Sequence, residues 1–312
     1  MPSSRSHAQS SSRRLDLKPY ALLVFTSLCW AGNVVVGQLA IGEVSPLLIV
    51  FLRWVIVASC LLAFNWRKLL AAWPVLRQKL GMLLLMAALG FTGFNALFYV
   101  AAHYTKGVNI GIIQGTMPAL VLLGAVIFYR SPVRLLQGLG VLATMLGVVV
   151  VAAGGDLGRL AALSLNSGDL IMLFACILYA GYAVALKRRP QVPAMVFFTA
   201  LSVIAMLSSL PLVIYEQASG NLVWPTWGGW LVVAYVALFP SFLAQITFIR
   251  GVELIGPERA GVFVNLVPIF AAILAVLILA EPFELYHAVA LVLVLGGIAL
   301  AESRKYKAVP PG

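Results

Sequence analysis

The architecture follows from residues 111–147, which read GIIQGTMPALVLLGAVIFYRSPVRLLQGLGVLATMLG. Residues 261–297 repeat the glycines and prolines of this stretch at a constant offset of 150, in the sequence GVFVNLVPIFAAILAVLILAEPFELYHAVALVLVLGG. Four positions match without a gap: Gly111, Pro118, Pro132 and Gly147 correspond to Gly261, Pro268, Pro282 and Gly297. Further upstream, Trp30-Ala31-Gly32 corresponds to Tyr179-Ala180-Gly181 at an offset of 149. The chain is therefore a tandem duplication.

The composition places both copies in a membrane. Of the 312 residues, 62% are hydrophobic and 10% are charged, whereas about 25% of residues are charged in soluble domains. A hydrocarbon core of about 30 Å requires about 20 apolar residues per helix. Ten spans of this kind are predicted, at residues 20–40, 46–65, 80–102, 108–129, 133–153, 167–186, 193–215, 227–249, 259–279 and 284–302.

Each copy holds five of these spans, and the odd number sets the orientation of the copies. The second copy must enter the membrane from the opposite face, which is the arrangement of many secondary transporters. We therefore expect an all-α integral membrane fold of ten transmembrane helices in two inverted five-helix repeats. The expected parts are a disordered cytoplasmic tail at 1–17, the first repeat at 18–153, an outer-side linker at 154–166, the second repeat at 167–303 and a cytoplasmic tail at 304–312.

The net charge is +11, and the basic residues that carry it fall almost entirely on one side of the predicted membrane topology. Of the 21 Lys and Arg, only Lys106 and Arg159 fall on the other side, and Arg53 lies inside a span. The positive-inside rule then places both termini in the cytoplasm. The same asymmetry makes the lipid bilayer, and not a nucleic acid, the expected partner of the basic groups.

Acidic residues are absent from the middle of every predicted span. All ten Asp and Glu fall in tails, loops or helix ends, whereas proton-coupled pumps usually hold a carboxylate or histidine deep in a span. His103 and His287 lie at outer helix ends, with interfacial hydrogen bonding as their first interpretation. No enzyme signature is present, and no cofactor or metal site is expected.

In place of acidic residues, the predicted spans contain amides and aromatic residues at helical spacing. Interhelical hydrogen bonding is one interpretation of such residues, because an amide cannot face lipid cheaply. Their recurrence at equivalent depths in both copies favours a cavity instead, suited to a small zwitterionic or amphipathic solute. The candidate substrate-binding residues are Trp30, Asn33, Asn95, Tyr99, Gln114, Tyr179, Tyr182, Gln245, Phe248 and Asn265.

Three further residues are candidates for gating or bending. Arg53 is the only charge well inside a span; a structural bond to backbone carbonyls is its first interpretation, with gating or attraction of a substrate carboxylate as alternatives. Pro118 and Pro268 stand in the middle of equivalent spans and each removes a helical hydrogen bond. Their duplication favours a hinge or a cavity-lining bend over an accident of packing.

These residues resemble the drug/metabolite transporter superfamily, in particular its EamA-type ten-helix exporters. The resemblance extends from Lys18 to Lys305 and is carried by Trp30-Ala31-Gly32-Asn33, by Pro46 followed by Arg53, and by Gly111, Pro118 and Pro132 with their repeat Gly261, Pro268 and Glu281-Pro282. Among relatives, the chain is most similar to bacterial exporters of aromatic amino acids and of methyl viologen. The resemblance implies a central cavity lined by spans one, three, four, six, eight and nine, with spans five and ten at the periphery.

The function expected from both lines of reasoning is export of amino acids, aromatic ones included, and of related small metabolites across the bacterial inner membrane. Transport is expected to occur by alternating access, with uncoupled facilitated diffusion as one energetic option. A proton-antiporting exporter of drugs or cationic compounds is the alternative within transport, and a membrane sensor or scaffold without transport is the alternative outside it. The expected partners are a small-molecule substrate and the bilayer, with the chain a monomer or weak homodimer.

Overall fold

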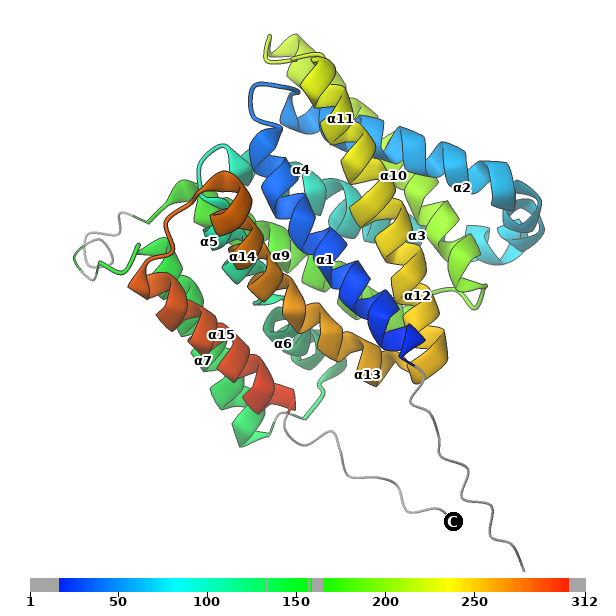
Figure 1. Cartoon of the computed structure of the whole chain (residues 1–312). Helices are drawn as coiled ribbons and strands as arrows, with labels where there is room; N and C mark the ends of the chain where they lie inside the picture. Colours follow the sequence, from blue (N-terminus) through cyan, green and yellow to red (C-terminus); the bar gives the residue numbers. More distant parts are fainter. Residues whose placement is uncertain (1–16, 133, 157, 159–164, 303–312) are drawn as a thin grey trace, which may run out of the picture.

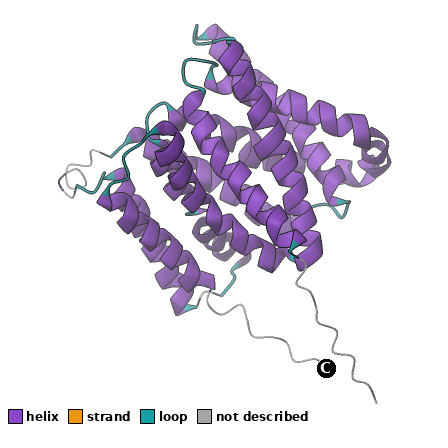
Figure 2. Ribbon diagram, viewed as in Figure 1, coloured by secondary structure: helices purple, strands orange, loops and turns teal. Residues whose placement is uncertain are grey.

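The computed structural model describes residues 17–132, 134–156, 158 and 165–302. Helices account for almost all of this part of the chain, and no strand occurs within it (Figures 1 and 2). The predicted tails, and most of the predicted linker at 154–166, lie outside the described residues. The α-helices are α1 (Lys18–Leu39), α2 (Pro46–Leu76), α3 (Leu80–Ala87), α4 (Phe94–Ala102), α5 (Gly107–Gln114), α6 (Met117–Tyr129), α7 (Leu135–Ala152), α9 (Ser167–Ala185), α10 (Ala194–Ala218), α11 (Trp227–Val236), α12 (Ala244–Ile255), α13 (Pro257–Val262), α14 (Val267–Leu279) and α15 (Leu285–Glu302).

Helix boundaries follow from local sequence. Proline stands in the first turn of α1, α2, α6, α13 and α14, where its missing N–H would have no helical partner in any case. Asn166 and Thr226 cap α9 and α11 by accepting a hydrogen bond from the backbone three residues on, as N-caps do. Pro132 and Pro282 follow soon after the ends of α6 and α14, because proline cannot continue a helix.

The predicted membrane fold is confirmed. Among the described residues, eight helical stretches are long and apolar enough to span a membrane, and the shorter apolar stretch Leu285–Ala301 accompanies them. One of the eight, Pro46–Ala102, has 57 residues and would be about 86 Å long if straight. It contains two predicted spans and turns at the short 3₁₀ segment η1 (Arg77–Lys79). The ten predicted spans are thereby accounted for.

The two copies pack around a pseudo-two-fold axis. Helices α2 and α7 each pack against their own counterparts, α10 and α15, and α5 of the first copy packs against α14 of the second (Figure 1). Helix α1 packs against α12 and α14 of the second copy, and its counterpart α9 packs against α4 and α6 of the first. Each copy thus supplies one side of every principal interface, as expected of inverted repeats.

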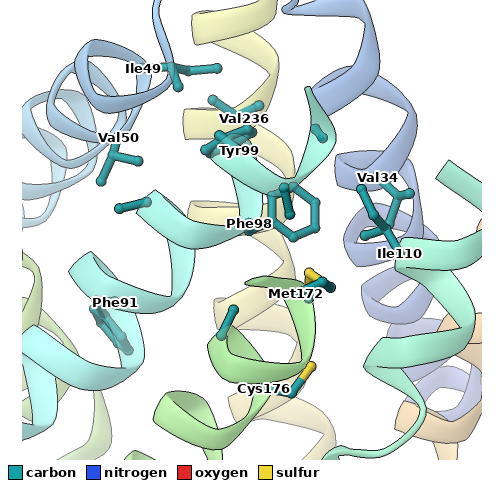
Figure 3. Close-up of a cluster of buried hydrophobic side chains, with 14 of the residues drawn as sticks. Val34, Ile49, Val50, Phe91, Phe98, Tyr99, Ile110, Met172, Cys176 and Val236 are labelled. Carbon is teal, nitrogen blue, oxygen red and sulfur yellow. The ribbon is translucent and has the colours of Figure 1, made fainter. Parts of the chain in front are cut away.

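The core between the copies is shared. Figure 3 shows Val34 of α1, Phe98 and Tyr99 of α4 and Met172 and Cys176 of α9 in one buried cluster. Tyr99, Phe98 and Met172 are exposed by 1% or less. Because the contacts cross from one repeat to the other, neither five-helix copy has a separate core of its own.

Four spans are interrupted at equivalent depths. Spans three and eight contain π-helical segments, η2 (Ala88–Gly93) and η4 (Ala237–Leu243). In η4 the irregularity has a local cause, because Pro240 lacks the N–H that a regular turn requires. Spans four and nine break just before Pro118 and Pro268, which begin α6 and α14 instead of bending a continuous helix. All four interruptions lie near the centre of the bundle.

Candidate binding cavity

A cavity of about 600 Å³ lies between the two repeats at the level of the interrupted helices. Its size and its mixture of apolar walls with a few polar groups are typical of small-molecule sites. Both copies contribute to its wall. The wall contains eight of the ten candidate substrate-binding residues and two of the three gating candidates, namely Trp30, Asn33, Asn95, Gln114, Tyr179, Tyr182, Gln245, Phe248, Arg53 and Pro118.

Three candidates lie outside the cavity wall. Tyr99 is buried behind it, and its hydroxyl donates to Asn33 Oδ1 at 2.8 Å. Asn265 lies in the short 3₁₀ segment η5 (Phe263–Leu266) between α13 and α14. Pro268 is buried at the start of α14, whereas its repeat counterpart Pro118 faces the cavity. The repeat pattern alone could not show which of Pro118 and Pro268 faces the cavity, because the two copies are not in identical surroundings.

Arg53 organises the polar part of the wall. Its Nη1 donates to Asn95 Oδ1 at 2.6 Å and to the Tyr99 hydroxyl at 3.0 Å, and its Nε donates to Ser241 Oγ. The expectation that Arg53 bonds to backbone carbonyls is therefore wrong. The physical reason is that α4 and η4 bring neutral side-chain acceptors within reach of the guanidinium.

The aromatic part of the wall is a continuous series of ring contacts. Trp54 stacks on Phe91 with centroids 4.8 Å apart, and Phe91 meets the edge of Tyr182 at 5.4 Å. Tyr182 contacts Tyr179 at 5.5 Å, and Tyr179 contacts Phe94 at 5.2 Å. We did not expect Trp54 and Phe91 in the wall from the sequence, since an aromatic residue in an apolar run is usually ordinary core. The one available signal was that Trp54 adjoins Arg53.

Two buried N–H groups of the cavity wall have no hydrogen-bond acceptor within the described residues, Trp54 Nε1 and Gln114 Nε2. Buried donors are normally paired, and an unpaired one costs about 1–3 kcal/mol.

By contrast, the indole of Trp30 is paired, since its Nε1 donates to the Pro240 carbonyl at 3.1 Å. That carbonyl lies in η4, where the π-helical turn alters the backbone hydrogen bonding. Irregular turns of this kind are frequent at functional sites.

The described residues of the cavity wall reach one end of the bundle. It is the end at which α1 begins and α15 ends (Figure 1), called here the terminal end. The wall there includes Gln137 at the start of α7, Leu186 just after α9 and Ala301 at the end of α15. Residues of spans two, five, seven and ten thus join the six spans that the family resemblance implied.

At the opposite end, carboxylates hold helix starts together. Glu216 at the end of α10 accepts hydrogen bonds from Ser45 Oγ and from the backbone N–H groups of Leu47 and Leu48, at 2.7 to 3.0 Å. Glu281, after α14, accepts from the backbone N–H groups at the start of α5, at 2.7 and 2.8 Å. Carboxylates at helix N-termini are favoured by unpaired N–H groups and by the helix dipole. This end of the bundle is closed.

A further buried acid lies near the closed end. Asp169 is fully buried in the first turn of α9, where Asn166 and not Asp169 is the N-cap. Its carboxylate accepts from Thr105 Oγ1 at 2.5 Å and from Asn109 Nδ2 at 3.1 Å. Asn109 Oδ1 in turn lies 3.1 Å from His287 Nε2. Tertiary packing thus buries an acid that the sequence places at a helix end.

The comparison with known families agrees with this architecture. The profile of the EamA-like transporter family matches residues 17–153 and, a second time, residues 166–302. The chain belongs to the EamA-like transporter family. This EamA-like protein is therefore a multi-pass membrane transporter of a small molecule, and the predicted resemblance to the drug/metabolite transporter superfamily is confirmed.

Relatives of this EamA-like transporter cover nearly its whole length. The uncharacterized transporter YetK of Bacillus subtilis (strain 168) is 29% identical over 92% of this chain and 87% of its own. The aromatic amino acid exporter YddG of Ancylobacter novellus is 24% identical over 90% of this chain and 96% of its own. A crystal structure with 18% identity superposes with a TM-score of 0.62, covering 92% of this chain and 98% of that chain. That last likeness concerns the fold alone.

Proposed function

We propose that the protein exports amino acids, aromatic ones included, across the bacterial inner membrane by alternating access. The observation that carries the proposal is the cavity between the inverted repeats, where amides and the aromatic series lie side by side. Amides bond both the carboxylate and the ammonium of an amino acid, and the rings cover an apolar side chain. The similarity to an aromatic amino acid exporter supports the same substrate class.

The proposed orientation places the terminal end in the cytoplasm. Basic residues close to helix ends, including Lys79, Lys187 and Arg250, gather at the terminal end, as the positive-inside rule requires. In that orientation the cavity extends to the cytoplasm and the carboxylate-held end faces outward. The conformation is then the one that accepts substrate from the cytoplasm. One chain encloses the whole cavity, so a monomer is sufficient for transport.

Flux in proteoliposomes tests the proposal. Asn33→Leu and Gln245→Leu each remove an amide from the cavity wall and are expected to lower the flux of L-phenylalanine and L-leucine at least tenfold, equivalent to about 1.4 kcal/mol. Gln217→Leu, at an exposed position near the end of α10, is the matched control and is expected to keep full flux. Absence of flux in the unmodified protein would support a sensor or scaffold instead.

Proton antiport is the second candidate, and the burial of Asp169 favours it. The carboxylate is fully buried, and the groups bonded to it, Thr105 and Asn109, are uncharged. His287 faces it through Asn109. A buried acid of this kind is a natural proton carrier. If flux depends on a pH gradient and Asp169→Asn removes that dependence, transport is proton-coupled; if flux is unchanged by the gradient, facilitated diffusion is supported.

A further inference from the structure

We infer that the cavity binds its substrate through a carboxylate anchored by Arg53, and that it excludes organic cations. The inference rests on the proposed function, since it specifies the substrate class of the same cavity. It depends on three observations: the free donors of Arg53, the absence of acidic side chains from the described wall, and the two unpaired donors of Trp54 and Gln114.

The guanidinium of Arg53 uses only part of its hydrogen-bonding capacity. It has five N–H donors, of which Nε makes one hydrogen bond and Nη1 makes two. Within the described residues Nη2 has no acceptor, although Arg53 is 5% exposed and contributes to the cavity wall. The bonds to Ser241, Asn95 and Tyr99 fix the plane of the guanidinium. They leave Nη2 to bond a solute in the cavity.

The charge of Arg53 is not neutralised by the protein. Every hydrogen-bond acceptor of Arg53 is a neutral side chain, and no Asp or Glu occurs among the described residues of the cavity wall. A buried cation without a counter-ion is costly, and the cost is largely recovered when an anion binds. Arginine and carboxylate form strong charge-assisted hydrogen bonds. The cavity is therefore electrostatically complementary to an anion.

Trp54 and Gln114 extend the excess of donors. Trp54 is 3% exposed, its ring lies 5.5 Å from the Arg53 guanidinium carbon, and its Nε1–H is unpaired. Gln114 presents an unpaired Nε2 from the end of α5, on another part of the wall. Each donor needs an acceptor that the described protein does not provide. A carboxylate accepts about four hydrogen bonds and donates none, so it matches this wall better than an amine does.

The second copy of the repeat has no counterpart of Arg53. The residues 149 and 150 positions after Arg53 are Ser202 and Val203, neither of which is charged. Among the described residues of the cavity wall Arg53 is the one Lys or Arg, and not a member of a symmetric pair, so the wall is suited to one carboxylate per transport cycle. The aromatic series that begins at Trp54 starts beside this anchor. A bound acid would then place its side chain along the rings.

Binding in detergent by isothermal titration calorimetry tests the inference without any need for flux. The probes are L-phenylalanine, 3-phenylpropanoate, L-phenylalaninamide and phenethylamine, with L-leucine and L-leucinamide as a second pair. The acids are expected to bind at least tenfold tighter than the amide or amine of the same side chain. Equal or tighter binding of the amides and the amine, or no binding of any acid, would overturn the inference.

Introducing a negative charge at Gln114 provides a second measurement. Gln114→Glu keeps the shape of the side chain and adds a carboxylate to the wall, so acid affinity is expected to fall at least tenfold while amide affinity rises. Gln217→Glu adds the same charge at an exposed position outside the cavity and is expected to leave both affinities unchanged. If Gln114→Glu leaves the preference for acids intact, Gln114 does not face the bound carboxylate and this part of the inference is wrong.

Two conservative variants address the anchor itself. Arg53→Lys keeps the charge but loses the planar fork, and acid affinity is expected to fall at least tenfold with the preference over amides retained. Trp54→Phe removes the N–H together with part of the indole, keeps an aromatic ring next to Phe91 and is expected to lower acid affinity about three- to tenfold. Unchanged acid affinity in folded Arg53→Lys and Trp54→Phe proteins would show that the carboxylate binds elsewhere. If acids bind but no flux is measured, the proposed function fails while this inference stands.

Discussion

Two residues end their helices in a conformation that L-amino acids rarely adopt. Arg130 after α6 has φ 49° and Ala280 after α14 has φ 53°, and both are left-handed C-caps. They are repeat counterparts, 150 residues apart. Glycine usually occupies this position, because a Cβ there costs about 1–2 kcal/mol. Both copies have a non-glycine residue in this strained conformation. The abrupt helix end before Pro132 and Pro282 is therefore common to both copies.

Replacing the strained alanine tests this interpretation. Ala280→Gly is expected to raise the free energy of unfolding by about 0.5–1 kcal/mol, since relief of the Cβ clash exceeds the added chain entropy of glycine. Ala63→Gly, at an exposed position inside α2, is the control and is expected to lower it by about 1 kcal/mol. Thermal unfolding in detergent measures both. Destabilisation by both substitutions would contradict the strain assigned to Ala280.

At the scale of the elements, α7 and α15 approach closely because glycines line their crossing. Gly140 and Gly297 face each other across it, and a Cβ on Gly297 would lie 2.5 Å from the Gly140 carbonyl oxygen and would also meet Thr144. Gly147 lies against Val294 and the Ala290 carbonyl. In lipid, helix association depends on this close contact, because the apolar solvent gives no hydrophobic drive. Gly147 and Gly297 belong to the residues that define the repeat, and they allow the close packing of α7 on α15.

Two neighbouring glycines of α15 allow a matched test of this crossing. Gly297→Ala is expected to separate α7 from α15 and to cost about 1–3 kcal/mol of stability. Gly296→Ala, one residue earlier, meets nothing within 4 Å and is expected to stabilise the helix by up to about 1 kcal/mol. Melting temperatures of the two variants in the same detergent make the comparison. Equal shifts would show that the crossing is not limited by the Gly297 contact.

At the scale of the whole molecule, the two repeats are in different states. Gly111 of α5 packs against α14, where an added Cβ would lie 2.5 Å from Ala271 Cβ. The counterparts of this pair, Gly261 and Val121, both face the cavity, and Gly261 has nothing within 4 Å of its Cβ position. The same contact is therefore closed at one end of the bundle and open at the other. Exchange of the two states between the repeats would open the cavity to the other side.

Cysteine cross-linking across each pair tests this exchange in a background with Cys29, Cys60 and Cys176 replaced. For the closed contact, Gly107→Cys with Ala275→Cys is used, because these Cβ positions of α5 and α14 lie 3.5 Å apart, a distance that a disulfide can bridge. This pair is expected to cross-link readily and to stop flux. Val121→Cys with Gly261→Cys is expected to cross-link only as the cavity closes, more slowly, and also to stop flux until the disulfide is reduced. If the second pair never cross-links while transport continues, the two ends do not exchange states as the repeat symmetry implies.

The sequence was sufficient for the membrane fold because its signals are local. Span length, charge distribution and the Gly111–Gly261 repeat each depend on residues close in the chain or at a constant offset, and they predicted ten helices in two inverted copies. Helical spacing also predicted which faces carry amides, so most of the candidate residues lie in one cavity wall. Their role in binding substrate remains a prediction.

What only the tertiary structure decided is which side chains meet across helices. The guanidinium of Arg53 bonds to Asn95, Tyr99 and Ser241, which come from helices 42 or more residues away. The unpaired donors of Trp54 and Gln114 are likewise properties of their surroundings, invisible in the sequence. Helix rotation and crossing angle select these contacts, and they depend on the packing of every neighbouring helix at once. The repeat symmetry is broken for the same reason, because equivalent residues in the two copies meet different neighbours.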